Sequence, residues 1–249
     1  MSERERIGKI ISSLDLGFSD FFKDENVRQL TLQEKLDTIE QAIELMQLEE
    51  SMNFSVFSSK GSKHPTAEIY AIDFPSDLRA STYLLLGGYY RQAILSLRNW
   101  LEIRLIGVYF ALVSREPSGY EDWKKGKRRA PIGKTLIRSL FSRGEFHKAN
   151  RFLRLREDIE KSYEELSAFM HGGRLTRPDL QSQTDNVPRF GPQSVDLWFE
   201  FASKIFRELV ICYFLAYGRN AFAMKEEEIA TLKKHLPSLY LRRLQEGGV

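Results

Sequence analysis

Three polar side chains share one face of an otherwise apolar helical stretch, LLLGGYYRQAILSLRNWLEIRLIGVYF. Arg91, Arg98 and Glu102 are spaced by seven and four residues, which places them along a single edge of an α-helix. Burying such charges without partners is strongly unfavourable, so they must pair with each other, pair with another helix or line a solvated groove. An internal ion-pair network, a ligand or catalytic groove and an interface with another chain are the three interpretations.

A second polar strip lies in YEELSAFMHGG, where Tyr163, Ser167 and His171 follow each other at four-residue steps. His171 falls in the last helical turn, where the helix dipole favours a charged imidazole, and this effect alone is one explanation for it. The functional interpretation requires this strip to face Arg98 and Glu102. A phosphate would then meet hydroxyl, imidazole and guanidinium groups, and the candidate catalytic residues are His171, Arg98 and Glu102. The other members of the predicted polar cluster are Arg91, Tyr163 and Ser167.

The middle of the chain is strongly basic, although the whole chain carries a net charge of only +3. Between Glu121 and Arg156 there are twelve Lys or Arg and three acidic residues, a local charge of +9, which leaves −6 for the remainder. Trp123, Phe141 and Phe152 lie among them. This mixture suits a nucleic-acid backbone, and equally a solvated loop or a docking surface for an acidic partner. The predicted nucleic-acid-binding residues are Lys124, Lys125, Lys127, Arg128, Arg129 and Lys134.

Other kinds of site find little support in the sequence. A metal site needs ligands at close spacing, whereas the four histidines are far apart: His64, His147, His171 and His235. The IGKT sequence at residues 132–135 resembles part of a phosphate-binding loop, but Arg128 occupies the position of its first glycine. No elbow sequence supports a serine triad, and Cys212 is expected to be a buried, unreactive thiol. We therefore predict neither a metal nor a cofactor.

The composition predicts a folded protein of the cytoplasm. The 249 residues are 42% hydrophobic and 12% aromatic, which is enough to fill a core. The N-terminal MSERERIGKI carries charges where a secretory signal needs an apolar stretch, so we expect a reducing cytoplasm. The longest apolar region, residues 83–113, contains charges that a bilayer disfavours, so we expect a core helix and no membrane span.

The first half of the chain is expected to form two helical regions. Thr31 and Glu34 fit a capping box that starts an amphipathic helix reaching to about Glu50. Serines, glycine and prolines between residues 51 and 75 predict a long connection with a brief strand. A second helical region then runs to about Val113, and Gly87-Gly88 divides or kinks it.

The second half predicts shorter helices around one long apolar helix. We expect Pro117 and Gly119 to end the preceding helix, followed by a basic loop. The remaining predicted helices cover residues 135–142, a stretch beginning at 145 or 151 and ending at 170, residues 195–217, and two short tail segments. The predicted class is all-α, an antiparallel bundle of four to five main helices. The expected parts, which form one globular unit, are residues 1–75, 76–219 and 220–249.

Residues 78–173 resemble the HEPN-like superfamily of small helical proteins, especially its abortive-infection-like branches. The likeness lies in YRQAILSLRNWLE, followed by YEELSAFMHGG. In that superfamily a helix of the form "YR.A...LR..LE" packs against one that ends in "Y..LS...H". The resemblance implies an antiparallel bundle, often dimeric, of prokaryotic toxin, defence and stress modules, in which some members are metal-independent ribonucleases.

The chain departs from the catalytic pattern of that superfamily. Catalytic members carry an arginine and, after four to six residues, a histidine, which handle the scissile phosphate and the attacking 2′-hydroxyl. Arg143 and His147 have only three residues between them, and fourteen separate Arg156 from His171. Neither pair fits the pattern.

The missing motif makes a binding role the leading hypothesis: an accessory HEPN-like protein of a prokaryotic defence or toxin-antitoxin module that acts on a partner protein or nucleic acid. The alternative is a metal-independent endoribonuclease that uses His171 with Arg98 or Arg174. A third possibility is a structural subunit that forms a homodimer through residues 195–217.

Overall fold

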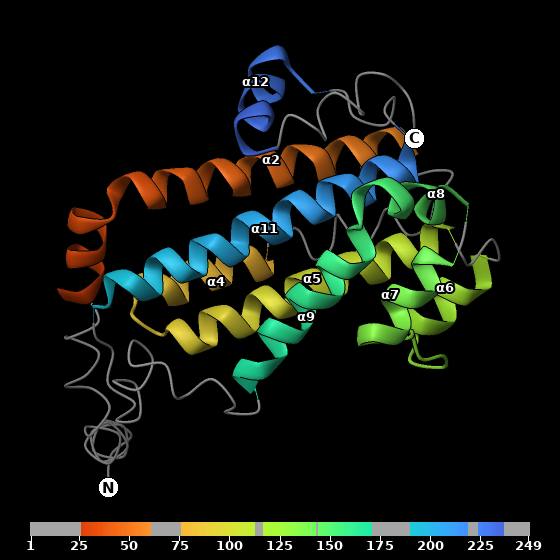
Figure 1. Ribbon diagram of the computed structural model, residues 1–249, viewed down its shortest axis with the longest axis horizontal. Coiled ribbons are helices and arrows are strands. Elements are labelled where there is room, and N and C mark those ends of the chain that lie inside the picture. The colour runs from red at the N-terminus through yellow and green to blue at the C-terminus, as the bar shows by residue number, and fades with distance from the viewer. Residues whose placement is uncertain are drawn as a thin grey trace, which may run out of the picture.

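The computed structural model shows an all-α protein and confirms the predicted class for the residues it describes, which are 26–60, 76–112, 117–142, 144–170, 190–218 and 224–236 (Figure 1). These residues contain no strand. Residues 26–34 are helical. The helices that follow are α2 (Leu36–Lys60), α4 (Ser76–Leu86), α5 (Tyr90–Leu112), α6 (Pro117–Lys124), α7 (Gly133–Phe141), α8 (Gly144–Leu153), α9 (Leu155–Met170), α11 (Pro192–Tyr217) and α12 (Glu226–His235).

The five main helices, α2, α4, α5, α9 and α11, alternate in direction along the chain. Gly87-Gly88 separates α4 from α5, and Gly88 has a φ of 80°, which glycine adopts without strain. The two helices form a hairpin in which the Ser81 hydroxyl donates to the Ala93 carbonyl at 2.6 Å. The sequence left a division or a kink open at the glycine pair, and the structure shows a division.

The last of these helices, α11, lies against α2, α5 and α9. It runs parallel to α2, since Lys35 and Asp196, near the starts of both, form an ion pair of 2.7 Å. It runs antiparallel to α9, because Phe169 at the end of α9 packs on Phe201 near the start of α11. The result is the up-and-down bundle that the sequence predicts. Figure 1 shows α6, α7 and α8 gathered together beside one end of this bundle.

Buried apolar side chains from α2 to α12 form one continuous cluster. Trp100 and Trp198 are among its largest members, each at most 1% exposed. Their indole N–H groups find acceptors, as buried tryptophans require: Trp198 donates to Ser81 at 2.7 Å and Trp100 to the Glu49 carboxylate at 2.6 Å. Burying each large side chain of this kind stabilises the fold by roughly 1.5–3 kcal/mol.

The predicted beginning and end of the first helix are wrong. Thr31 lies inside the helical residues 26–34, and its hydroxyl donates to the Val27 carbonyl at 2.8 Å, so it does not cap a helix. A bend at Lys35 leads into α2, which continues to Lys60. The predicted strand is also wrong for residues 51–60, because Met52 is fully buried and core packing outweighs the local serine pattern. Residues 61–75 lie outside the described part.

The middle of the chain is more helical than predicted. Pro117 begins α6 and does not end a helix, which agrees with the preference of proline for a first helical turn. The predicted helix up to Met170 is two helices, because Arg154 has a φ of 52° between α8 and α9. The side chain of Asn150 accepts from the backbone N–H of Arg156 at 2.7 Å and so caps α9.

The C-terminal segment packs on the N-terminal one. His235 of α12 lies 3.2 Å from the carboxylate of Glu44 on α2, and its ring meets Phe206 edge-on. The second predicted tail segment lies outside the described residues. No described helix has the length and hydropathy needed to cross a membrane.

Candidate functional site

The polar strips of α5 and α9 face each other, as the sequence predicts. Arg98 donates from Nε to the hydroxyl of Ser167 at 3.2 Å and from Nη2 to the hydroxyl of Tyr163 at 2.5 Å. Its guanidinium also lies over the Tyr163 ring, 4.9 Å from the centroid. Glu102, one turn later on α5, approaches Arg98 Nη2 at 3.4 Å. We call these four side chains the polar cluster.

Helix α7 begins against the polar cluster. The backbone N–H of Gly133 donates to Glu102 Oε1 at 3.0 Å, which satisfies one of the free donors of the first helical turn. Gly133 has a φ of 54°, and a Cβ at this position would lie 2.8 Å from the Tyr163 hydroxyl. Only glycine fits this contact without displacing Tyr163.

The geometry of the polar cluster favours the ion-pair interpretation. The side chains of Arg98 and Glu102 are 16% and 14% exposed, and the guanidinium has acceptors on three sides. Binding a phosphate would require Arg98 to give up these partners. Arg91, half-buried two turns earlier, takes no part in the hydrogen bonds and ion pair described above. The predicted acid or base, His171, lies outside the described residues, as does Arg174.

Acidic residues of α9 neutralise the cations of α7. Lys134, predicted to bind nucleic acid, forms an ion pair with Glu164. Arg138 approaches Glu160 at 3.6 Å, and Arg156 approaches the same carboxylate at 3.1 Å. The local excess of positive charge seen in the sequence is therefore smaller on this side of the molecule.

The last residue of α6 and the connection to α7 carry the other predicted cations, and we call residues 124–129 the basic segment. Lys124 lies 6.0 Å from the centroid of the Tyr120 ring, and Lys125 approaches Glu121 at 3.5 Å. The remaining three are exposed, and within the described part of the chain they form no ion pair and no side-chain hydrogen bond: Lys127, Arg128 and Arg129. The positive charge of these three residues is therefore exposed to solvent and is not balanced by a described acidic side chain.

The backbone of the basic segment is held in a tight turn. The carbonyl of Asp122 accepts from the N–H groups of Lys127 at 2.7 Å and Arg128 at 3.1 Å. Gly126 has a φ of 70°, the left-handed conformation common after a helix C-terminus. The cations therefore project from a backbone with a defined conformation.

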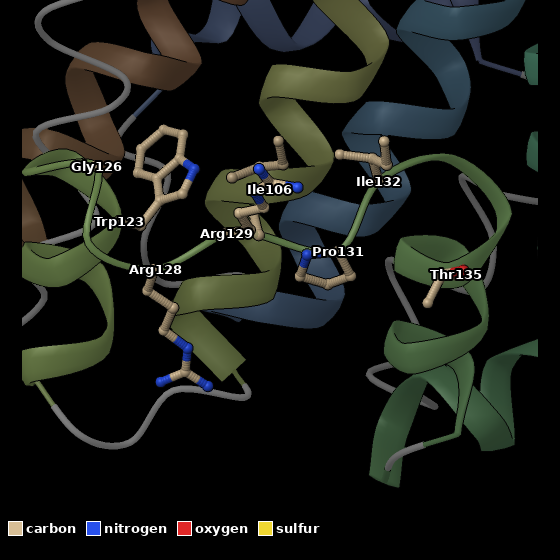
Figure 2. Close-up of a pocket in the computed structure, with 9 residues that line it drawn as sticks. Ile106, Trp123, Gly126, Arg128, Arg129, Pro131, Ile132 and Thr135 are labelled. Atoms are coloured by element: carbon tan, nitrogen blue, oxygen red, sulfur yellow. The ribbon is translucent and has the colours of Figure 1, made fainter.

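An open groove of about 580 Å³ lies beside the basic segment. Arg128, Arg129 and the hydroxyl-bearing Thr135 contribute its polar groups (Figure 2). Its apolar lining consists of Ile106, Trp123, Ala130, Pro131 and Ile132. Sequence reasoning noted Trp123 among the cations but missed the groove, because Ile106 of α5 joins it only through tertiary packing.

Trp123 is held in place by two other aromatic side chains. Its ring centroid lies 5.4 Å from that of Phe110 and 6.0 Å from that of Tyr120, and Phe110 meets Tyr120 edge-on at 5.9 Å. Phe110 and Tyr120 are buried, whereas Trp123 is partly exposed and lines the groove. The Trp123 ring therefore forms an aromatic wall of the groove, and Phe110 and Tyr120 pack against it from the core.

Two further polar sites are buried away from the groove. Glu49, 2% exposed, accepts from Arg104 Nε at 2.8 Å as well as from Trp100. On α11, burial raises the pKa of Glu208 to about 7, although the hydrogen bond from Ser162 lowers it in part. Burial also raises the pKa of the Cys212 thiol, as expected for an unreactive cysteine.

The described residues contain no cluster of three His, Cys, Asp or Glu side chains that could hold a metal ion. No family model matches the chain, and comparison with curated proteins and with solved structures finds no match. The HEPN-like resemblance therefore rests on the sequence motifs alone and stays a prediction.

Proposed function

We propose that this protein is a non-catalytic, HEPN-like helical bundle that binds nucleic acid through its basic segment. The observation that carries the proposal is a group of three exposed cations on a turn beside an aromatic groove, Lys127, Arg128 and Arg129, which have no side-chain partner in the described part of the chain. The sequence resemblance suggests the setting, an accessory role in a prokaryotic defence or toxin-antitoxin module.

The charge distribution supports a phosphate backbone as the ligand. Neighbouring cations such as Lys134 and Arg138 have carboxylate partners on α9, whereas the three cations of the turn have none in the described part of the chain. Nucleic-acid phosphates are closely spaced, and each one neutralised by a cation releases condensed counterions. Three adjacent cations on one turn suit that spacing.

The polar cluster supports a role without catalysis. A ribonuclease of this type needs an arginine free to stabilise developing charge on the phosphate. Arg98 already donates to Tyr163 and Ser167 and lies beside Glu102. The endoribonuclease that uses His171 remains the alternative proposal.

The binding test uses fluorescence anisotropy of a labelled RNA of mixed sequence, titrated with full-length protein at several salt concentrations. We expect affinity to fall steeply with salt, and a Lys127→Glu, Arg128→Glu, Arg129→Glu variant to bind at least tenfold more weakly with a flatter salt dependence. A matched control reverses three other exposed lysines to glutamate, with the same change in net charge: Lys161, Lys225 and Lys233. The control variant should retain most of the affinity.

Three results would overturn the proposal. If the wild-type protein shows no salt-sensitive binding to RNA or DNA, the basic segment serves an acidic protein partner or faces solvent. If the protein cleaves the RNA and His171→Ala abolishes the cleavage, the ribonuclease alternative is correct. Equal loss of binding in both triple variants would assign the effect to net charge and not to the basic segment.

A further inference from the structure

We infer that the groove beside the basic segment binds an unpaired base against Trp123, so that the ligand is single-stranded nucleic acid. This inference rests on the proposed function, because the basic segment supplies the attraction for the phosphates. The inference specifies the class of nucleic acid. The cations alone cannot do so, since duplex and single strand both present phosphates. The evidence for it is the shape and chemistry of the groove.

The groove provides the surface that a base needs. Its walls include the Trp123 ring and the apolar side chains of Ile106 and Ile132, and the open space between them measures about 580 Å³, which is sufficient for a base. A base stacks on an aromatic ring through its planar face, which is exposed in a single strand. In a duplex that face is covered by the neighbouring base pairs.

The aromatic wall is organised before a ligand arrives. Phe110 and Tyr120 fix the position of the Trp123 ring from the core side, and the indole remains partly exposed where it lines the groove. A rigid platform loses little conformational entropy on binding, so most of the stacking free energy contributes to affinity.

The cations are placed on both sides of the segment that crosses the groove. In Figure 2 the Arg128 side chain points away from the Trp123 ring, whereas the Arg129 side chain leaves the connection on the opposite side, toward Ile106. A nucleotide stacked on Trp123 has a phosphate on each side of its sugar. Two arginines that diverge from adjacent positions suit two successive phosphates.

The groove offers few groups for reading the edge of a base. Apart from the two arginines, the polar side-chain groups of the lining are the Thr135 hydroxyl and the indole N–H of Trp123. Base identity is read by hydrogen bonds to donor and acceptor edges, whereas stacking tolerates every base. We therefore expect binding with little sequence preference.

Intrinsic tryptophan fluorescence tests this inference, because the three tryptophans differ in burial. Trp100 and Trp198 are at most 1% exposed, so quenching by a stacked base must come from Trp123. Titration with an unlabelled single-stranded oligonucleotide should quench emission in a saturable manner. An abasic strand of the same length keeps the phosphates and should bind without that quenching, and a duplex of the same sequence should quench far less.

Two substitutions at Trp123 separate stacking from packing. Trp123→Phe keeps an aromatic face and should retain affinity for the single strand within about threefold, whereas Trp123→Leu should weaken it about tenfold. Duplex binding measured by anisotropy should be the same for both variants and the wild type. Thermal unfolding of both variants reports whether the fold is kept, and the comparison with duplex provides an internal reference if Trp123→Leu is less stable.

The results that would overturn this inference can be distinguished from those that would overturn the proposed function. Salt-sensitive binding that is equally tight for single strand, duplex and abasic strand, with no quenching, would overturn the stacking inference and leave the basic segment as a phosphate contact. Unchanged single-strand affinity in Trp123→Leu would overturn it as well. Absence of binding to every probe would overturn both.

Discussion

The polar cluster and the basic segment contain similar side chains in opposite environments. Arg98 sits between α5 and α9, 16% exposed, with two hydroxyls and a carboxylate around its guanidinium. Arg129 sits on an exposed turn beside a tryptophan, with no side-chain partner among the described residues. Both regions combine arginine with an aromatic ring. In the polar cluster the guanidinium interacts with side chains of the protein, whereas in the basic segment it is exposed to solvent.

This difference shows that a cation is available to a ligand only when the fold leaves it without partners. The enclosed arginine fixes the register of two helices, because its planar fork matches acceptors on both. The exposed cations contribute little to folding, since surface charges in high dielectric interact weakly. Variants that affect stability in one region and binding in the other therefore test the comparison.

We expect the largest effect on stability at the most deeply buried ion pair, which Glu49 forms with Arg104. Glu49→Leu leaves Arg104, which is 2% exposed, and the Trp100 N–H without their shared acceptor. We expect a loss of about 3–5 kcal/mol in the free energy of unfolding, measured by urea denaturation. Glu121→Leu removes the exposed pair with Lys125 and should cost less than about 0.5 kcal/mol. Similar losses in both variants would contradict the distinction between enclosed and exposed charges.

The buried carboxyl of Glu208 should make stability depend on pH. Its pKa is about 7 in the folded protein against an ordinary value of 4.5, so the native state holds a proton that the unfolded chain has released between these values. Stability is then highest below pH 4.5, falls by about 3 kcal/mol as pH rises to 7, and no longer changes above it for this group.

Glu208→Gln isolates this contribution, because the amide keeps the shape and can accept from Ser162 without a charge. Urea denaturation of both proteins from pH 5 to pH 8 should show that the difference in stability, variant minus wild type, rises with pH. A difference that stays constant over this range would show that Glu208 ionises normally.

The stability cost of replacing a glycine can be compared between the two regions, because each contains a glycine with a similar positive φ. Gly133 has a φ of 54° and no space for a Cβ beside Tyr163, whereas Gly126 has a φ of 70° and open space around it. Gly126→Ala should cost about 1–2 kcal/mol from backbone strain alone. Gly133→Ala should cost about 1–3 kcal/mol more, because Tyr163 must move away from Arg98. Thermal unfolding measures both, and equal shifts would contradict the close packing around Gly133.

One arginine from each region separates an effect on binding from an effect on stability. Arg129→Leu should alter the free energy of unfolding by less than about 0.5 kcal/mol and weaken RNA binding. Arg98→Leu should show the reverse, a loss of about 2 kcal/mol in stability with RNA affinity unchanged. Urea denaturation and anisotropy on the same protein samples measure the two quantities. A fall in RNA affinity for Arg98→Leu would place the polar cluster in the binding site.

The sequence by itself determined the local features of this protein. Apolar periodicity predicted α5 and α11, the glycine pair at 87–88 predicted a division or a kink, and the spacing of Arg98 with Glu102 predicted one polar face. Such patterns are informative because residues three or four apart must lie on the same side of a helix. They failed at Thr31 and Pro117, where the same residue types suit more than one place in a helix.

Only the tertiary structure decided which charges have partners and where a groove exists. Lys134 and Arg138 look as available as Arg128 in the sequence, but α9 brings Glu164 and Glu160 against the first two. The groove likewise combines α5, α6 and the chain leading to α7. Contacts between segments distant in sequence depend on how helices pack, which spacing within one segment does not specify.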